Sequence, residues 1–204
     1  MLCSNFVQSL FLCIRFRPLL TGFFHNRHTK PGGWVELQEI YHFPMSNNAR
    51  MGPDHPVAQY WRFVDEGLRE LGVDMGLISS RLGGSPSRDP YQSGRQSQSQ
   101  SNEHQGIADL MRRSGFVNVK ESVFHVPVGG WAQNRMLKSV GVLWKTILLD
   151  GLQAIALRPL MRGLHWDRDQ VETFLVAVRK AYHDNSCQMY MPLVCVYSQK
   201  PADH

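Results

Sequence analysis

The stretch KPGGWVELQEI, residues 30–40, decides the fold prediction because it joins a sharp turn to an alternating strand. Pro31 fixes one backbone angle, and the two glycines after it adopt conformations closed to other residues, so the chain can turn sharply here. Apolar residues then alternate with Glu36, Gln38 and Glu39, which is the pattern of a β-strand with a polar carboxyl end.

The composition is that of one globular domain. The 204 residues are 43% hydrophobic and 19% charged, which excludes a fibrous or wholly disordered protein. The net charge is +5, but residues 1–35 hold four basic and no acidic residues, so the remainder carries only +1. Basic residues such as Arg112 and Arg113 do not build the continuous stripe that nucleic acids require, and no nucleic-acid partner is predicted.

The four cysteines show neither a CxxC pair nor the density of a secreted scaffold. They predict reduced thiols in an intracellular protein, and no metal site is predicted. Residues 6–24 are apolar but contain Arg15 and Arg17, which are costly in a bilayer. A mitochondrial presequence is the alternative for this segment, but such presequences are rich in serine and this segment contains little of it. We therefore expect a cytoplasmic or nuclear protein without a membrane span.

The hydrophobic spacing predicts a series of elements after the first strand. The first three are a helix over 57–71 closed by Gly72, a short helix over 107–114, and a strand over 116–128 bent near Lys120. They are followed by a helix over 136–158 that is broken around Gly151, a helix that begins at the capping box of Asp167 and Gln170, and a strand over 187–201. The last strand is apolar on both faces, which places it inside a sheet covered by helices. Residues 83–106 are of low complexity and predict a disordered insert.

The apolar stripe within residues 136–148 has two interpretations. A helix that lies on a membrane surface carries a strongly basic face, and Lys138 and Lys145 are too few to form one. The stripe is therefore predicted to belong to a core or lid helix.

Three pieces of the sequence together resemble a known family: KPGGWVELQEI, then ADLMRRSGFVNVKESVFHVPVGGW, then MYMPLVCVYSQKP. In this order they are similar to the C-terminal half of class I S-adenosylmethionine-dependent methyltransferases. More narrowly they resemble the fungal LaeA-like, or TAM-domain, methyltransferases, which act in secondary metabolism. The match covers about residues 30–201. It implies an α/β fold, the C-terminal portion of a Rossmann-like sheet with flanking helices, and methyl transfer to an unknown acceptor without a metal.

The resemblance also implies a cofactor site that this sequence does not supply. The family binds S-adenosylmethionine through a glycine-rich turn and an acidic residue at a strand end. The chain has no G-x-G and no acidic residue before Glu36. We predict no cofactor-binding residue and expect a truncated form, for which inactivity is one alternative, from a shortened gene model or a truncated relative. Residues 1–29 are then an atypical segment, and residues 30–204 a methyltransferase-like domain interrupted by the 83–106 insert.

Site candidates follow from the implied fold. Ligands of open α/β sheets lie beyond the carboxyl ends of the strands, so the polar end of the first strand is expected to point toward the ligand. The candidates for the substrate pocket are Glu36, Gln38, Glu39, Tyr41 and Trp131. Glu36 and Gln38 lie earlier in the strand and are expected on alternating faces. Exposed polar residues on a strand edge, and a core position for Trp131, are the alternatives.

No catalytic residue is predicted, because methyl transfer depends chiefly on positioning and on exclusion of water. The competing function is a cofactor-free interaction or regulatory protein related to the LaeA-like methyltransferases. A half-sheet exposes an unpaired strand edge and an apolar face, and such surfaces recruit partners. A protein partner at the exposed sheet edge is the corresponding expectation.

Overall fold

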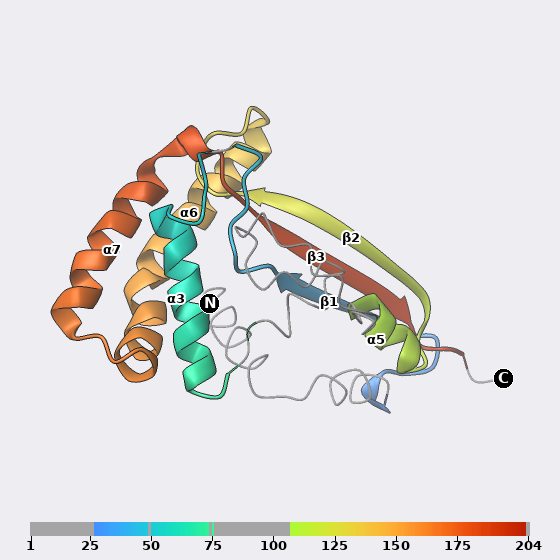
Figure 1. Cartoon of the computed structure of the whole chain (residues 1–204). Helices are drawn as coiled ribbons and strands as arrows, with labels where there is room; N and C mark the ends of the chain where they lie inside the picture. Colours follow the sequence, from blue (N-terminus) through green and yellow to red (C-terminus); the bar gives the residue numbers. More distant parts are fainter. Residues whose placement is uncertain (1–26, 49, 74, 76–106, 203–204) are drawn as a thin grey trace, which may run out of the picture.

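The computed structural model describes residues 27–48, 50–73, 75 and 107–202 (Figure 1). The strands are β1 (Trp34–Ile40), β2 (Val117–Pro127) and β3 (Tyr190–Gln199). The α-helices are α3 (Pro56–Glu70), α5 (Ile107–Arg113), α6 (Arg135–Arg158) and α7 (Arg168–His183). Two short turns of other helical types, η2 (Pro159–Gly163) and η3 (Asn185–Cys187), follow α6 and α7. The described chain is thus mixed α/β.

The sheet has the strand order β1-β3-β2, and both pairings are antiparallel. Because β1 and β2 both run against β3, they run parallel to each other. Their carboxyl ends therefore lie at the same end of the sheet, next to the start of β3. The predicted central place of the last strand is confirmed, and the predicted bend of β2 appears as a register shift between Val117 and Lys120.

Three helices form the main core at the end of the sheet where β3 begins. Figure 1 shows α3, α6 and α7 side by side there, while the other end of the sheet extends away from them. Tyr60 donates a hydrogen bond from its hydroxyl to the Leu152 carbonyl at 2.9 Å, and the Trp61 indole donates to the Tyr182 hydroxyl at 3.0 Å. Both bonds are buried and join α3 to the other two helices, so the three helices pack as one unit.

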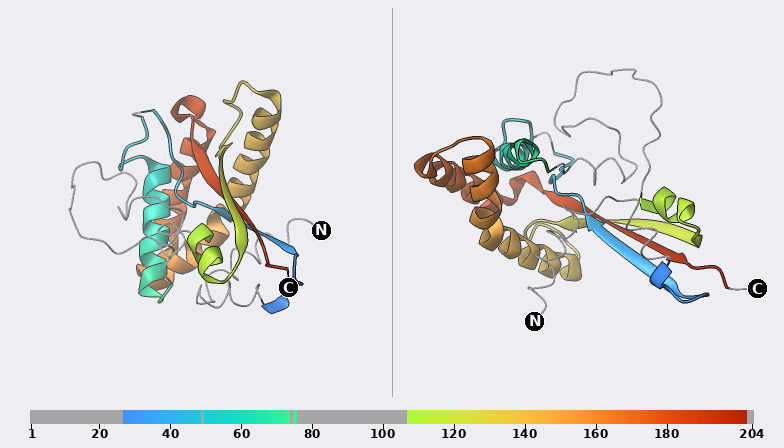
Figure 2. Two further views of the ribbon diagram at one scale, coloured as in Figure 1. Left: turned by 90° about the vertical axis from the view of Figure 1, so that its right-hand side faces the viewer. Right: turned by 90° about the horizontal axis from the view of Figure 1, so that it is seen from below.

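A smaller core lies along the extended part of the sheet, where α5 covers one face (Figure 2). It consists of Ile107, Ala108, Met111 and Phe116 packed against Val194 and Val196 of β3. On the other face of β3, Leu193, Cys195 and Tyr197 are only half-buried. The prediction that the last strand is covered on both faces is therefore wrong for this half of the sheet.

The helix boundaries follow from local chemistry. His55 caps α3 by accepting a hydrogen bond from the Val57 N–H, and Gly72 follows the helix with φ of +78°, a conformation that glycine adopts without strain. Asp167 and Gln170 form the predicted capping box at the start of α7. The glycine and the capping box were predicted from the sequence, the His55 cap was not, and both helices are confirmed.

Two predictions for α6 are wrong. The helix is continuous through Gly151, because a single glycine costs only about 1 kcal/mol in a helix and the packing of its neighbours Leu148 and Leu152 holds the backbone. It does end as an α-helix before Pro159. The predicted core role applies only to the second half, since Leu152 and Ala156 are buried whereas side chains from Met136 to Ile147 are largely exposed.

Two further predictions lie outside the described residues. The disordered insert at 83–106 is one, and most of the atypical segment at 1–29 is the other. The division of the chain into these parts therefore stays a prediction.

Candidate functional site

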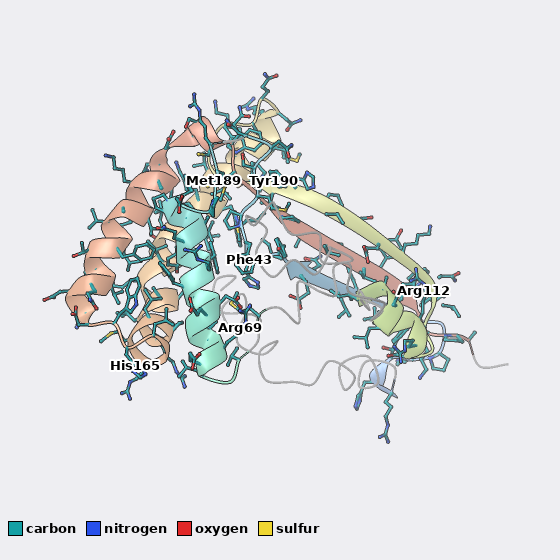
Figure 3. The ribbon with its side chains drawn as sticks, in the orientation of Figure 1. Phe43, Arg69, Arg112, His165, Met189 and Tyr190 are labelled. Carbon is teal, nitrogen blue, oxygen red and sulfur yellow. The ribbon has the colours of Figure 1, made fainter. Side chains whose placement is uncertain are left out.

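The candidate site is built where β1 and β2 end and β3 begins. The segment after β1 is joined to β3 by the Tyr41 N–H, which donates to the Pro192 carbonyl at 2.8 Å, and by paired backbone bonds between Met45 and Tyr190. On the other side of β3, the Val128 N–H donates to the Met189 carbonyl at 2.8 Å. We call residues 41–45, 128–131 and 189–190 together the carboxyl-end region. Figure 3 labels three of its members, Phe43, Met189 and Tyr190, near the helices.

Aromatic rings gather in and beside this region. Tyr41 and Phe43 lie with ring centroids 5.7 Å apart, and His42 lies 5.8 Å from Trp61 of α3. His125 stacks on Tyr190 at 4.4 Å with an interplanar angle of 28°. The region is thus rich in aromatic rings that pack against one another.

Tyr41 and Trp131 are the two predicted residues that the fold brings to the carboxyl-end region. Both are half-buried and flank the start of β3 from opposite sides. The Trp131 indole N–H donates to the Met189 carbonyl at 2.8 Å, which fixes its ring over the beginning of β3. Their role in binding an acceptor stays a prediction.

Glu36 and Gln38 lie away from this region. Their cross-strand partners on β3 are Tyr197 and Cys195, several residues from the carboxyl end, and both side chains are exposed. The Gln38 amide donates to the Glu36 carboxylate at 2.8 Å. The two residues share one face of β1, so the expected alternation between them is wrong: side chains two positions apart in a strand point to the same side.

Glu39 occupies the opposite face of β1. It lies across from Val194, whose side chain packs under α5, and it is half-buried. Of the three polar residues predicted on β1, Glu39 is therefore the nearest to the carboxyl end but faces the α5 side.

The sequence included His42 in the polar strand end expected to point toward the ligand, without placing it among the candidates for the substrate pocket, and it did not indicate Tyr190. His42 is 8% exposed, and burial lowers its pKa to about 4, so the ring is neutral at pH 7. Tyr190 sits on a strand read only as apolar, and its hydroxyl donates to Asn47 at 3.4 Å. The position of His42 just after the polar strand end was the available signal, whereas the His125–Tyr190 stack joins strands far apart in sequence and gave none.

A second cluster joins His55, Cys187 and Asp184. The Cys187 sulfur lies 3.5 Å from Nε2 of His55. Burial, and then the charge of Asp184, raise the pKa of the Cys187 thiol, so it stays protonated and is a poor nucleophile. Ser46 donates to the Cys187 carbonyl. This cluster ties the start of α3 to η3, and its chemistry indicates a structural role.

The glycine turn between β2 and α6 provides a test for a cofactor. A Cβ on Gly129 would lie 2.5 Å from the Asn185 Oδ1, and one on Gly130 would lie 3.3 Å from a methyl group of Val142. The chain itself therefore fills the space beside both glycines. The side chain of Asn134 already accepts hydrogen bonds from two N–H groups in the first turn of α6. This turn does not fit the carboxylate of S-adenosylmethionine.

The ribose hydroxyls of the cofactor need an acidic residue at the end of a strand. Among the described strands, β2 ends at Pro127 and β3 at Gln199, while Glu39, next to the last residue of β1, is half-buried and faces the α5 side. In the described part of the chain there is also no group of three or more His, Cys, Asp or Glu side chains able to hold a metal ion. The fold thus brings the predicted residues Tyr41 and Trp131 to the start of β3, and the Gly129 turn does not fit the cofactor.

The chain is similar in sequence to several fungal proteins. The chain is 25% identical to "Probable methyltransferase tdiE" of Emericella nidulans over 84% of its own length and 46% of that protein. It is 24% identical to "Methyltransferase pytC" of Aspergillus terreus, over 85% of this chain and 46% of that protein. It is also 24% identical to "Secondary metabolism regulator LAE1" of Cochliobolus heterostrophus, over 80% of this chain and 45% of that protein.

No family model matches the chain, and no solved structure matches it. The chain spans about half the length of the curated relatives it matches. The relatives are fungal methyltransferases and include LaeA-like proteins, which confirms the resemblance read from the sequence.

Proposed function

We propose that this chain forms the acceptor side of a methyltransferase that uses S-adenosylmethionine. The observation that carries the proposal is its similarity, over about 84% of its length, to fungal methyltransferases of about twice its length. The acceptor binds at the carboxyl-end region, where open α/β sheets bind their ligands. The cofactor is held by residues other than the described ones, because the Gly129 turn is filled by the chain itself.

The residues of the carboxyl-end region act by positioning. Tyr41 and Trp131 lie on either side of the start of β3 and offer ring faces to a flat acceptor, with the Trp131 ring fixed by its hydrogen bond to Met189. His42 is neutral and buried, so it contributes no charge to the site. Such a site excludes water and orients the acceptor, which are the main requirements for transfer of a methyl group.

The test joins transcript sequencing to methyl-transfer assays. We expect a longer message that encodes a glycine-rich turn upstream of residue 30, with a product that binds S-adenosylmethionine and methylates an acceptor. In that product Trp131→Ala should lower kcat/KM for the acceptor at least tenfold, while the affinity for the cofactor is unchanged. A message that encodes only these 204 residues, with a folded product that does not bind the cofactor, would overturn the proposal.

A cofactor-free interaction protein is the second candidate. The observation that favours it is the outer edge of β1, a strand that pairs only with β3 among the described residues. That edge has neither a proline nor a lysine, whereas β2 is protected by Lys120, Pro127 and a bulge. A protein that copurifies with the chain, and is lost from a folded Gln38→Pro variant that removes an N–H pointing away from β3, would support this function.

A further inference from the structure

The first half of α6 exposes a continuous line of apolar side chains. The line consists of Met136, Val140, Leu143 and Ile147, which we call the α6 stripe; Met136 is 75% and Leu143 65% exposed. Successive members are four, three and four residues apart, so they lie on one side of the helix. A contiguous exposed line of this kind marks a contact surface.

The stripe cannot turn inward, because the other side of α6 is already packed. Leu148, Leu152 and Ala156 are buried in the main core. Gly141 lies so close to the Gly129 carbonyl that a Cβ at this position would clash with it. The helix is therefore held in one rotation about its axis, with the α6 stripe toward solvent.

The spacing of the stripe is that of a helix–helix seam. Alternating steps of three and four residues are the pattern by which two α-helices interlock their side chains. The same steps continue to Asp150 and Ala154, which are also exposed. The geometry thus favours a second helix as the covering element.

The charges near the two ends of the α6 stripe indicate that the second helix is α6 of another copy of the chain. Arg135 is the first residue of α6, and residues 135–149 contain no acidic side chain. Asp150 follows 15 residues after Arg135, one step beyond the end of the α6 stripe. Neither Arg135 nor Asp150 forms an ion pair with another described residue. The midpoint between them coincides, within one residue, with the midpoint of the α6 stripe. A twofold axis there would place each Asp150 beside the positive N-terminal turn and Arg135 of the other helix.

We propose that α6 pairs antiparallel with α6 of a second copy of this chain through the α6 stripe. The interface is isologous: the four apolar side chains of each copy interlock, and two Arg135–Asp150 pairs close its ends. This assembly does not depend on methyl transfer, so it can be tested independently of the proposed function.

A lipid surface is the other occupant to consider. The helix spanning Arg135–Gly163 is long and apolar enough to cross a membrane by length and composition, a criterion that core helices also meet. Helices that lie on lipid carry a strongly basic border, whereas the exposed side of α6 has only Arg135 and Lys138 in its first turns and places the acidic Asp150 at its far end. Self-pairing uses these features, and lipid binding does not.

Sedimentation velocity of the full chain tests the proposal. We expect a dimer at about 100 μM, a concentration at which a weak but specific interface is populated. Leu143→Asp should give a monomer with unchanged circular dichroism. The matched control is Val176→Asp on α7, which introduces the same charge at a side chain that is 64% exposed, and it should stay dimeric. A monomeric wild type, or a dimer that Leu143→Asp leaves intact, would overturn the proposal.

Charge exchange tests the antiparallel arrangement. Asp150→Arg should weaken the dimer about tenfold, because it replaces two attractions by two repulsions. The double variant Arg135→Glu with Asp150→Arg should restore affinity to within about threefold of wild type. Failure of the double variant to recover, or binding of wild-type monomers to phosphatidylserine vesicles without any dimer in solution, would contradict it.

Discussion

Gly67 is the residue at which α3 approaches η2 most closely. A Cβ on Gly67 would clash with the Pro159 carbonyl, and one on Gly163 would clash with the Gly67 backbone. Both glycines are buried. The two backbones are therefore in direct contact, and this contact sets how α3 sits against the end of α6.

Gly67→Ala should lower the free energy of unfolding by about 1–3 kcal/mol, since the clash is with backbone that cannot move aside cheaply. Gly151→Ala is the control at a half-buried helix position with room for a methyl group: its Cβ would meet only the Ile155 methyl at 3.5 Å. That change should raise stability by roughly 0.5–1 kcal/mol through helix propensity. Urea denaturation measures both, and a stabilising effect of Gly67→Ala would refute the close crossing.

His42 gives the molecule a pH dependence that can be measured. Burial lowers its pKa in the folded chain to about 4 from 6.5, so the unfolded chain binds the proton first as the pH falls. The stability from neutral His42 is thus complete above pH 6.5 and is lost toward pH 4, by about 1.4 kcal/mol per pH unit. Urea midpoints between pH 7 and 5 should show this slope, and His42→Phe should reduce it. An identical slope in the variant would contradict the assignment.

At the scale of elements, α7 has one face in the main core and one in solvent. Leu175 is fully buried, whereas its neighbour Val176 is 64% exposed. Leu175→Ala should cost about 2–5 kcal/mol, because it removes buried apolar atoms and leaves a cavity. Val176→Ala should change stability by less than about 0.5 kcal/mol. Thermal denaturation of the two variants checks the helix orientation, which equal effects would disprove.

The elements could be predicted from the sequence wherever local chemistry decides them. The capping box at Asp167, the glycine after α3 and the alternation in β1 each fix a boundary through neighbouring residues. The surroundings of an element could not be predicted in this way. The apolar stripe at the start of α6 looks the same in sequence whether it faces the core or solvent, and only the packing of Leu148 and Leu152 decides which side is inside.

The candidate site likewise contains residues whose place could be predicted from the sequence and residues whose place could not. The place of Tyr41 and Trp131 at the carboxyl-end region could be predicted because they follow strands, and the end of a strand is visible in sequence, while their role in binding stays a prediction. Glu36 and Gln38 were misplaced because their polarity suggested a ligand, although strand geometry puts them together on one exposed face. Tyr190 was missed because its partner His125 comes from another strand.

At the scale of the whole molecule, the described chain has one region where strands and helices meet and two exposed surfaces. The carboxyl-end region joins all three strands to the helices, while the α6 stripe faces solvent and the outer edge of β1 has no strand neighbour among the described residues. The described residues leave no room for a cofactor beside the Gly129 turn. The acceptor-binding role therefore rests on the similarity to fungal methyltransferases and remains our proposal.

The most direct test of this account is calorimetric titration of the folded 204-residue chain with S-adenosylmethionine, after circular dichroism has verified its helix and strand content. The account predicts no saturable heat, because neither the Gly129 turn nor the end of a described strand supplies an anchor for the cofactor. Saturable binding with a stoichiometry near one would contradict it and would mean that this chain holds the cofactor by itself.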